Sequence, residues 1–160
     1  MATATTNRLI VPPSRFARLM GLYGENYWTL TRLLGPQQLA VRGVYESSGS
    51  HGFPLRIDLL ERARFTLEFK LSYAGFDTPE QRPNPSAHVR FYLDAQVAEV
   101  TACHRGSRIE DVLGRGAGSE AVLQHRLRMN VFLQKWLAYL EDCGHWRLGW
   151  RPVGRASDCA

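Results

Sequence analysis

The stretch Leu55-Arg-Ile-Asp-Leu-Leu-Glu-Arg-Ala-Arg-Phe-Thr-Leu-Glu-Phe-Lys-Leu-Ser-Tyr73 decides the fold of this sequence. Apolar side chains alternate with polar ones on both sides of a short charged interruption. This period of two predicts two strands of an antiparallel sheet, with one buried face and one wet face. A three-residue turn within 61–64 would keep the odd-numbered residues of both strands on the same face. The residues expected to face inward are Leu55, Ile57, Leu59, Phe65, Leu67, Phe69, Leu71 and Tyr73.

A second hairpin follows a proline-rich connection at 75–86. We expect strands at 88–93 and 97–103, joined by a tight turn at 93–96. The register pairs Tyr92 with Val97, Phe91 with Ala98, Arg90 with Glu99, and Val89 with Val100. Apolar pairs then share one face, while Arg90 and Glu99 lie opposite each other on the other face. Opposite charges in that arrangement contribute about 0.2–1 kcal/mol.

Two helices flank the strands. Ser14 is a plausible N-cap of the first helix, which ends at Gly35-Pro36. Gly21 and Gly24 weaken this helix and could let another backbone approach closely. Its predicted apolar stripe consists of Phe16, Leu19, Met20, Tyr23, Tyr27, Leu30 and Leu34.

The second helix begins at 119–120, with Ser119 as N-cap, and ends at Gly144. A further strand is expected at 38–46. The sequence therefore predicts an α+β domain: a largely antiparallel sheet of about five strands packed by an N-terminal and a C-terminal helix. We expect a disordered segment at 1–12, a single domain at 13–150 and a flexible tail at 151–160.

Composition limits the class of protein. The 160 residues are 44% hydrophobic and 22% charged, which is typical of a globular domain and excludes disordered and coiled-coil classes. No apolar run approaches the roughly 20 residues of a membrane span, and the N-terminus lacks the features of a secretory signal. Three scattered cysteines argue against a disulfide framework. We therefore expect a cytoplasmic protein with no membrane association.

The chain is basic, with a net charge of +5 and 18 Arg against 2 Lys. A basic protein attracts nucleic acids, but a nucleic-acid binder usually concentrates its charge on one face or in one run. These arginines are spread over the whole chain. Nucleic-acid binding is therefore a possible function that the sequence does not favour.

Two other patterns are incomplete. The glycine-rich run at 114–119 precedes a helix, but no buried strand and βαβ unit surround it, and the Lys-Ser/Thr pair of a phosphate-binding loop is missing. The five histidines include no pair at i, i+4 and, with the cysteines, form no four-ligand set. We expect a flexible loop at 104–118, no metal and no cofactor.

The candidate site residues lie near the ends of the two hairpins. Glu61 falls on the apolar parity of its strand, where a partly desolvated carboxylate should seek an arginine. Arg90, Tyr92, Asp94 and Glu99 cluster on the polar side of the second hairpin. These groups could line a pocket with acid, base and phenol functions. A salt-bridge network that fixes the register is the favoured interpretation.

Two residues of the last helix complete the set. Asn130 is unfavourable inside a helix, so it could hydrogen-bond a neighbouring loop or strand. Trp136 is expected in the core, with its indole N–H meeting a carbonyl.

Several segments resemble the YqiB-like family of uncharacterised proteobacterial proteins. They are residues 25–34, 60–66 and 89–100, the pattern Asn130-x-x-Leu-x-x-Trp136-Leu, and the helix end at Cys143-Gly144. The chain departs from the family pattern at Leu93, where relatives usually carry His. It also has Arg-Gly-Ala-Gly at 115–118, where relatives have an aromatic and proline-containing loop. The resemblance implies a stand-alone cytoplasmic domain and names no reaction.

The leading hypothesis is a non-enzymatic domain that binds a protein or a small ligand in a cleft between sheet and helix. The alternative is a hydrolase or other enzyme acting on a phosphorylated or nucleotide-like ligand. In that case Arg62 and Arg90 would contact the anion, and Asp94 or Glu99 would be the general base. Arginine-mediated nucleic-acid binding is the third hypothesis.

Overall fold

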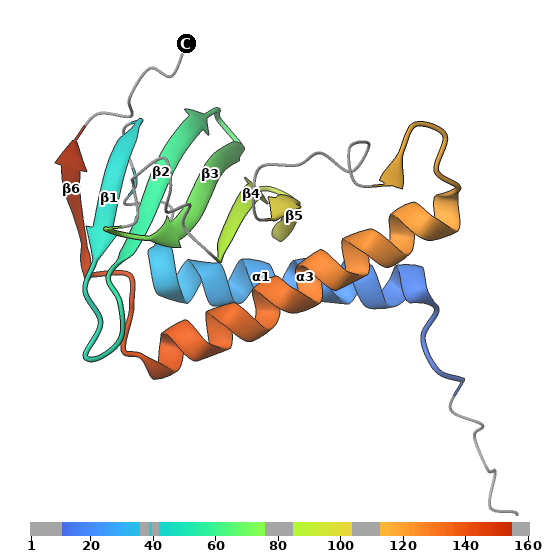
Figure 1. The fold of residues 1–160 in the computed structure, drawn as a ribbon, viewed down its shortest axis with the longest axis horizontal. Coiled ribbons are helices and arrows are strands. Elements are labelled where there is room, and N and C mark those ends of the chain that lie inside the picture. The colour runs from blue at the N-terminus through green and yellow to red at the C-terminus, as the bar shows by residue number, and fades with distance from the viewer. Residues whose placement is uncertain (1–10, 36–38, 40–41, 76–84, 104–112, 155–160) are drawn as a thin grey trace, which may run out of the picture.

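A six-stranded antiparallel sheet carries two long helices on one of its faces (Figure 1). The computed structural model describes residues 11–35, 39, 42–75, 85–103 and 113–154. The sheet order is β5-β4-β3-β2-β1-β6. The α+β class and the antiparallel sheet are confirmed, but the sheet has six strands and not about five. The elements are α1 (Arg15–Leu34), β1 (Gly43–Ser47), β2 (Leu55–Arg62), β3 (Thr66–Tyr73), β4 (Ser86–Tyr92), β5 (Val97–Cys103), α3 (Ser119–Asp142) and β6 (Trp150–Gly154).

The additional strand is β6, in a region for which the sequence predicted a flexible tail from 151. It pairs with β1 and is mostly exposed. Its residues show no apolar alternation, because the strand buries almost no side chain, and so no pattern in the sequence indicated it. Residues 155–160 of the predicted tail and 1–10 of the predicted N-terminal segment lie outside the described residues, as do 38, 40 and 41 of the predicted first strand.

The predicted inward face forms the centre of the core. Leu55, Ile57, Leu59, Leu67, Phe69 and Leu71 are all buried, and Tyr73 packs against them. Phe65 was predicted to join them but is 48% exposed. It lies in the connection at 63–65, where the Ala63 N–H donates to the Thr66 carbonyl at 2.8 Å. This turn is displaced by one residue from the predicted one, and Phe65 leaves the strand.

A β-bulge explains a second difference. The register shifts between Leu59 and Glu61, so that Leu59 opposes Phe69 but Glu61 opposes Glu68. A bulge inserts one extra residue into a strand and moves the residues beyond it to the other face. Glu61 is therefore exposed, and the prediction that it lies partly desolvated on the apolar face is wrong.

Helix α1 begins and ends as predicted. The Ser14 side chain accepts a hydrogen bond from the Ala17 N–H at 3.1 Å, and Gly35 ends the helix with a φ of 51°. Two members of the predicted stripe are not buried, however. Phe16 is 63% exposed and Met20 42% exposed, because the apolar stripe is wider than the face that the sheet and α3 cover.

Helix α3 runs parallel to α1, so both helices begin at the same end of the molecule (Figure 1). Its N-cap is Gly118 and not the predicted Ser119. The direction follows from contacts that keep a nearly constant offset in sequence along both helices. These contacts are Arg15–Glu120, Asn26–Asn130 and Arg32–Glu141.

The segment after α3 completes the end of α1. The Arg147 N–H donates to the Arg32 carbonyl at 3.0 Å, and the Trp150 indole donates to the Leu33 carbonyl at 2.6 Å. Both bonds satisfy carbonyls that a helix end leaves free. Within the described ranges, no helix combines the length and apolar character needed to cross a membrane.

Candidate functional site

The second hairpin has the predicted register, with Arg90 opposite Glu99 and Tyr92 opposite Val97. Arg90 and Glu99 were expected to form an ion pair with each other, but each has a different ion-pair partner. The Arg90 guanidinium lies 3.6 Å from a carboxylate oxygen of Glu68 on β3. Glu99 instead accepts a hydrogen bond from the Tyr92 hydroxyl at 3.0 Å.

Helix α3 supplies the cation that Glu99 binds. Arg126 Nη1 lies 2.9 Å from Glu99 Oε2 and 3.5 Å from the Tyr23 hydroxyl of α1. Burial raises the pKa of both Tyr23 and Tyr92, so both phenols stay protonated at neutral pH. The carboxylate of Glu99 is thus held by a phenol and a guanidinium, in an arrangement that fastens α3 to the hairpin.

Three residues of this network, Glu68, Arg126 and Tyr23, were not among the predicted site residues. Glu68 could have been found, because it has the polar parity of β3 and lies beside Arg90 in the β3–β4 register. Arg126 and Tyr23 come from the two helices, and no pattern in the sequence indicates that either reaches the hairpin.

The other predicted site residues lie apart from this network, each in its own surroundings. Glu61 is exposed at the end of β2. Arg62 donates to the Leu39 carbonyl at 2.6 Å. Asp94 accepts from the Ala95 N–H at 2.9 Å within the hairpin turn.

Asn130 is fully buried and makes the contact with a strand that its position indicated. Its Oδ1 accepts the Val100 N–H at 3.2 Å, and its Nδ2 donates to the Arg126 carbonyl at 2.8 Å. Because β5 is the outermost strand on its side, this N–H points away from β4 and needs a partner outside the sheet. Asn130 therefore seals the edge of the sheet against α3.

Trp136 lies in the core, as predicted, and is 5% exposed. Its indole N–H meets the Tyr73 hydroxyl at 3.1 Å and not a carbonyl. The structure thus gives both helix residues of the candidate set a packing role.

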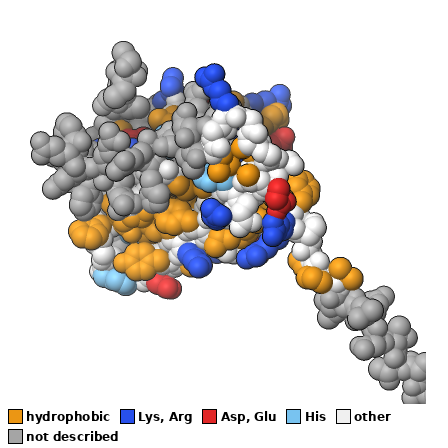
Figure 2. All heavy atoms as spheres, turned by 45° about the vertical axis from the view of Figure 1, so that its right-hand side comes forward, with side chains coloured by type: hydrophobic (Ala, Val, Ile, Leu, Met, Phe, Trp, Pro, Cys, Tyr) orange, Lys and Arg blue, Asp and Glu red, His pale blue; other side chains and the backbone are white. Residues whose placement is uncertain are grey.

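A basic surface with an apolar floor lies near the end at which both helices begin. In Figure 2, Lys and Arg side chains stand among hydrophobic ones on this side of the molecule. A hollow of about 330 Å³ opens here between α1 and α3. We call it the arginine groove, and it is lined by Arg15, Arg18, Gln124, Leu127, Arg128 and Val131.

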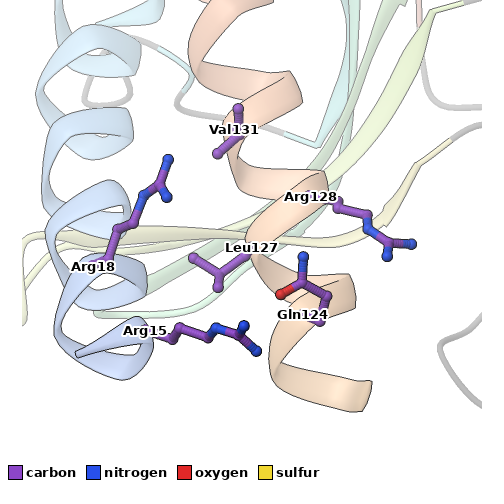
Figure 3. A pocket seen from close by; sticks show the side chains of 6 residues that line it. All are labelled: Arg15, Arg18, Gln124, Leu127, Arg128 and Val131. Carbon is purple, nitrogen blue, oxygen red and sulfur yellow. The ribbon is translucent and has the colours of Figure 1, made fainter. Parts of the chain in front are cut away.

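The close view shows how these side chains are arranged (Figure 3). Arg15 extends from α1 toward α3, and Leu127 lies between the two helices. Arg18 stands one turn further along α1, and Arg128 projects from α3 away from α1. The groove thus has cations at its rim and aliphatic side chains at its floor.

The charges of the groove are not fully compensated. Arg15 forms an ion pair with Glu120. Within the described ranges, Arg18 and Arg128 have no ion-pair partner. The groove also lies beside the first turn of α1, where the positive end of the helix dipole favours an anion. The sequence could not reveal the groove, because α1 and α3 are about a hundred residues apart.

The described residues include no group of three or more His, Cys, Asp or Glu side chains that could hold a metal ion. The groove offers guanidinium and amide donors, which suit anionic oxygens and not cations.

Comparison with known proteins identifies the family. Residues 29–146 match the model of a family described as Protein of unknown function (DUF1249). The match covers most of the chain, and the chain belongs to this family. No curated protein and no solved structure matches the chain.

Proposed function

We propose that this chain is a non-enzymatic, cytoplasmic binding domain, and that it binds an anionic small molecule in the arginine groove. We also propose that it belongs with the YqiB-like members of its family. The observation that carries the functional proposal is the pair Arg18 and Arg128, which stand without ion-pair partners, among the described residues, beside an apolar floor.

The lining of the groove indicates which ligands fit. Arginine binds carboxylate and phosphate groups through two parallel hydrogen bonds. Leu127 and Val131 contribute an apolar surface beside these donors, and the volume lies at the lower end of small-molecule sites. We therefore expect a ligand that joins one anionic group to a compact apolar body.

The polar residues of the hairpin support binding over catalysis. Glu99 is bonded to both Tyr92 and Arg126. A general base must be free to take a proton from a substrate. Breaking these contacts would weaken the attachment of α3 to the hairpin, so the proposal assigns this network to the fold and the groove to the ligand.

The test compares phenyl phosphate, inorganic phosphate and phenol in a thermal-shift titration of the full chain. Phenyl phosphate should stabilise the protein most, because it alone carries both parts of the expected ligand. At ten times its Kd the stabilisation is about 1.4 kcal/mol. The double variant Arg18→Gln, Arg128→Gln should lose this effect. The matched control Arg151→Gln, on β6, removes one exposed positive charge elsewhere and should retain it.

Three results would contradict the proposal. The first is equal stabilisation by phenyl phosphate and inorganic phosphate. The second is an effect that survives in the double variant, and the third is an equal loss in Arg151→Gln. Release of phenol from phenyl phosphate by the wild-type chain alone would support the enzymatic alternative in place of binding.

A further inference from the structure

The face of α1 that turns away from the sheet is apolar although it is exposed. Met20 is 42% exposed and Trp28 52%, and with Gly24 between them they share one side of the helix. Met20 and Trp28 lie about 12 Å apart along the helix at 1.5 Å per residue. Isolated exposed apolar residues are ordinary, but a continuous apolar helix face usually marks an interaction site.

Two glycines on this face have no role within the described chain. A Cβ added at Gly21 or Gly24 would meet nothing within 4 Å. Glycine inside a helix costs up to about 1 kcal/mol relative to alanine. Glycines on an exposed helix face allow another helix to approach closely, and here that helix must come from outside the described chain.

We propose that this face binds a second copy of the same chain, with the two α1 helices packed antiparallel about a two-fold axis between Gly21 and Gly24. This register sets Gly21 against Gly24 of the second copy. It also sets Ala17 against Trp28 of the second copy, so that the large indole meets a small residue. The same patch is used by both copies, as a two-fold interface requires.

The charges on the helix favour this arrangement. At 3.6 residues per turn, Arg18 and Glu25 lie on the same edge of the apolar face. In an antiparallel pair that edge meets itself, and the register brings Arg18 close to Glu25 of the second copy, twice by symmetry. In a parallel pair with a two-fold axis along the helices, this edge would lie opposite the other edge of the second helix, so Arg18 and Glu25 would not meet. Glu25 bonds only Gln134 among the described residues, and both side chains of this pair are exposed.

This proposal does not depend on ligand binding in the arginine groove, although Arg18 contributes to both surfaces. Trp28, Gly24 and Glu25 do not line the groove. Variants at these positions therefore test self-association alone, whereas Arg128→Gln affects the groove alone.

The first experiment is analytical ultracentrifugation of the full chain from about 10 to 500 µM, because a dimer of this kind depends on concentration. The mean mass should rise toward twice that of the monomer. Gly24→Leu is the most informative variant: leucine favours the helix, so the monomer stays folded, but the side chain blocks close approach. It should abolish the rise. Leu148→Ala removes another exposed apolar side chain and should leave the rise unchanged.

A charge swap tests the antiparallel register. Arg18→Glu and Glu25→Arg should each weaken association about tenfold, and the double variant should recover most of the loss. A chain that stays monomeric at every concentration would overturn the proposal. So would association that survives Gly24→Leu, or a double variant as weak as the two single changes combined.

Discussion

Replacing Asn130 with alanine should destabilise the fold far more than the loss of one surface polar residue. The side chain is fully buried and accepts the Val100 N–H of the outermost strand. Alanine leaves that N–H buried and without a partner, which costs about 1–3 kcal/mol. A small cavity adds to this cost. We expect a total loss of about 3 kcal/mol in the free energy of unfolding.

Asn26 provides a matched control, because it is the same residue type and is equally buried. Its Nδ2 donates to the Asn130 carbonyl at 3.3 Å, but its Oδ1 has no partner among the described residues. Asn26→Ala removes one hydrogen bond but leaves no N–H of a strand without its partner. The expected loss is about 1 kcal/mol.

Urea denaturation followed by tryptophan fluorescence measures both losses. Hydrogen exchange supplies the residue-specific readout, since the Val100 amide should lose protection in Asn130→Ala beyond what the global destabilisation explains. Equal losses in the two variants, or an unchanged Val100 exchange rate relative to its neighbours, would refute the role given to Asn130.

Three further predictions concern titratable groups. Burial lowers the pKa of His88 and His145, so the unfolded chain takes up protons before the folded chain as the pH falls through about 6.5. The free energy of unfolding should therefore be highest above that pH, and Tm should fall between pH 7 and pH 5; a constant Tm over this range would contradict the burial of these side chains. Glu99→Gln should lower the free energy of unfolding by only about 1 kcal/mol, because the Glu99–Arg126 contact is only partly shielded from solvent. Urea denaturation measures this loss, and an unchanged free energy of unfolding would show that the contact does not stabilise the fold. Burial raises the pKa of Cys103 to about 12, so its alkylation at pH 8, followed by peptide mass mapping, should be much slower in the native chain than in urea, and equal rates would contradict its burial.

The alternation from Leu55 to Tyr73 and the Arg90–Glu99 register could be predicted, because strand parity is a local property of the sequence. The bulge before Glu61 could not. Leu59 and Leu60 are both apolar, so either could have continued the inward face. The position of the bulge depends on how the turn at 63–65 closes, and that in turn decides the face on which Glu61 lies.

The helices likewise have some features that the sequence predicts and others that it does not. The ends of α1 could be predicted from Ser14 and Gly35, because helix caps act locally. The exposure of Phe16 could not be predicted, since it depends on how far the sheet and α3 extend over the helix. The arginine groove and the Arg126–Glu99 contact arise only when helices distant in sequence are placed side by side. Composition therefore shows many arginines, but not that two of them line one groove without an ion-pair partner in the described part of the chain.

The arrangement at the two margins of the sheet has a consequence for the behaviour of the protein at high concentration. Exposed edge strands are the usual starting points for amyloid-like growth, because their free N–H groups recruit the strand of another molecule. Here the amide of Val100 on one margin is already bonded by Asn130. On the other margin β6 carries Pro152, which has no N–H to offer. An intruding strand would therefore find a helix at one side and a gap in the hydrogen-bonding ladder at the other.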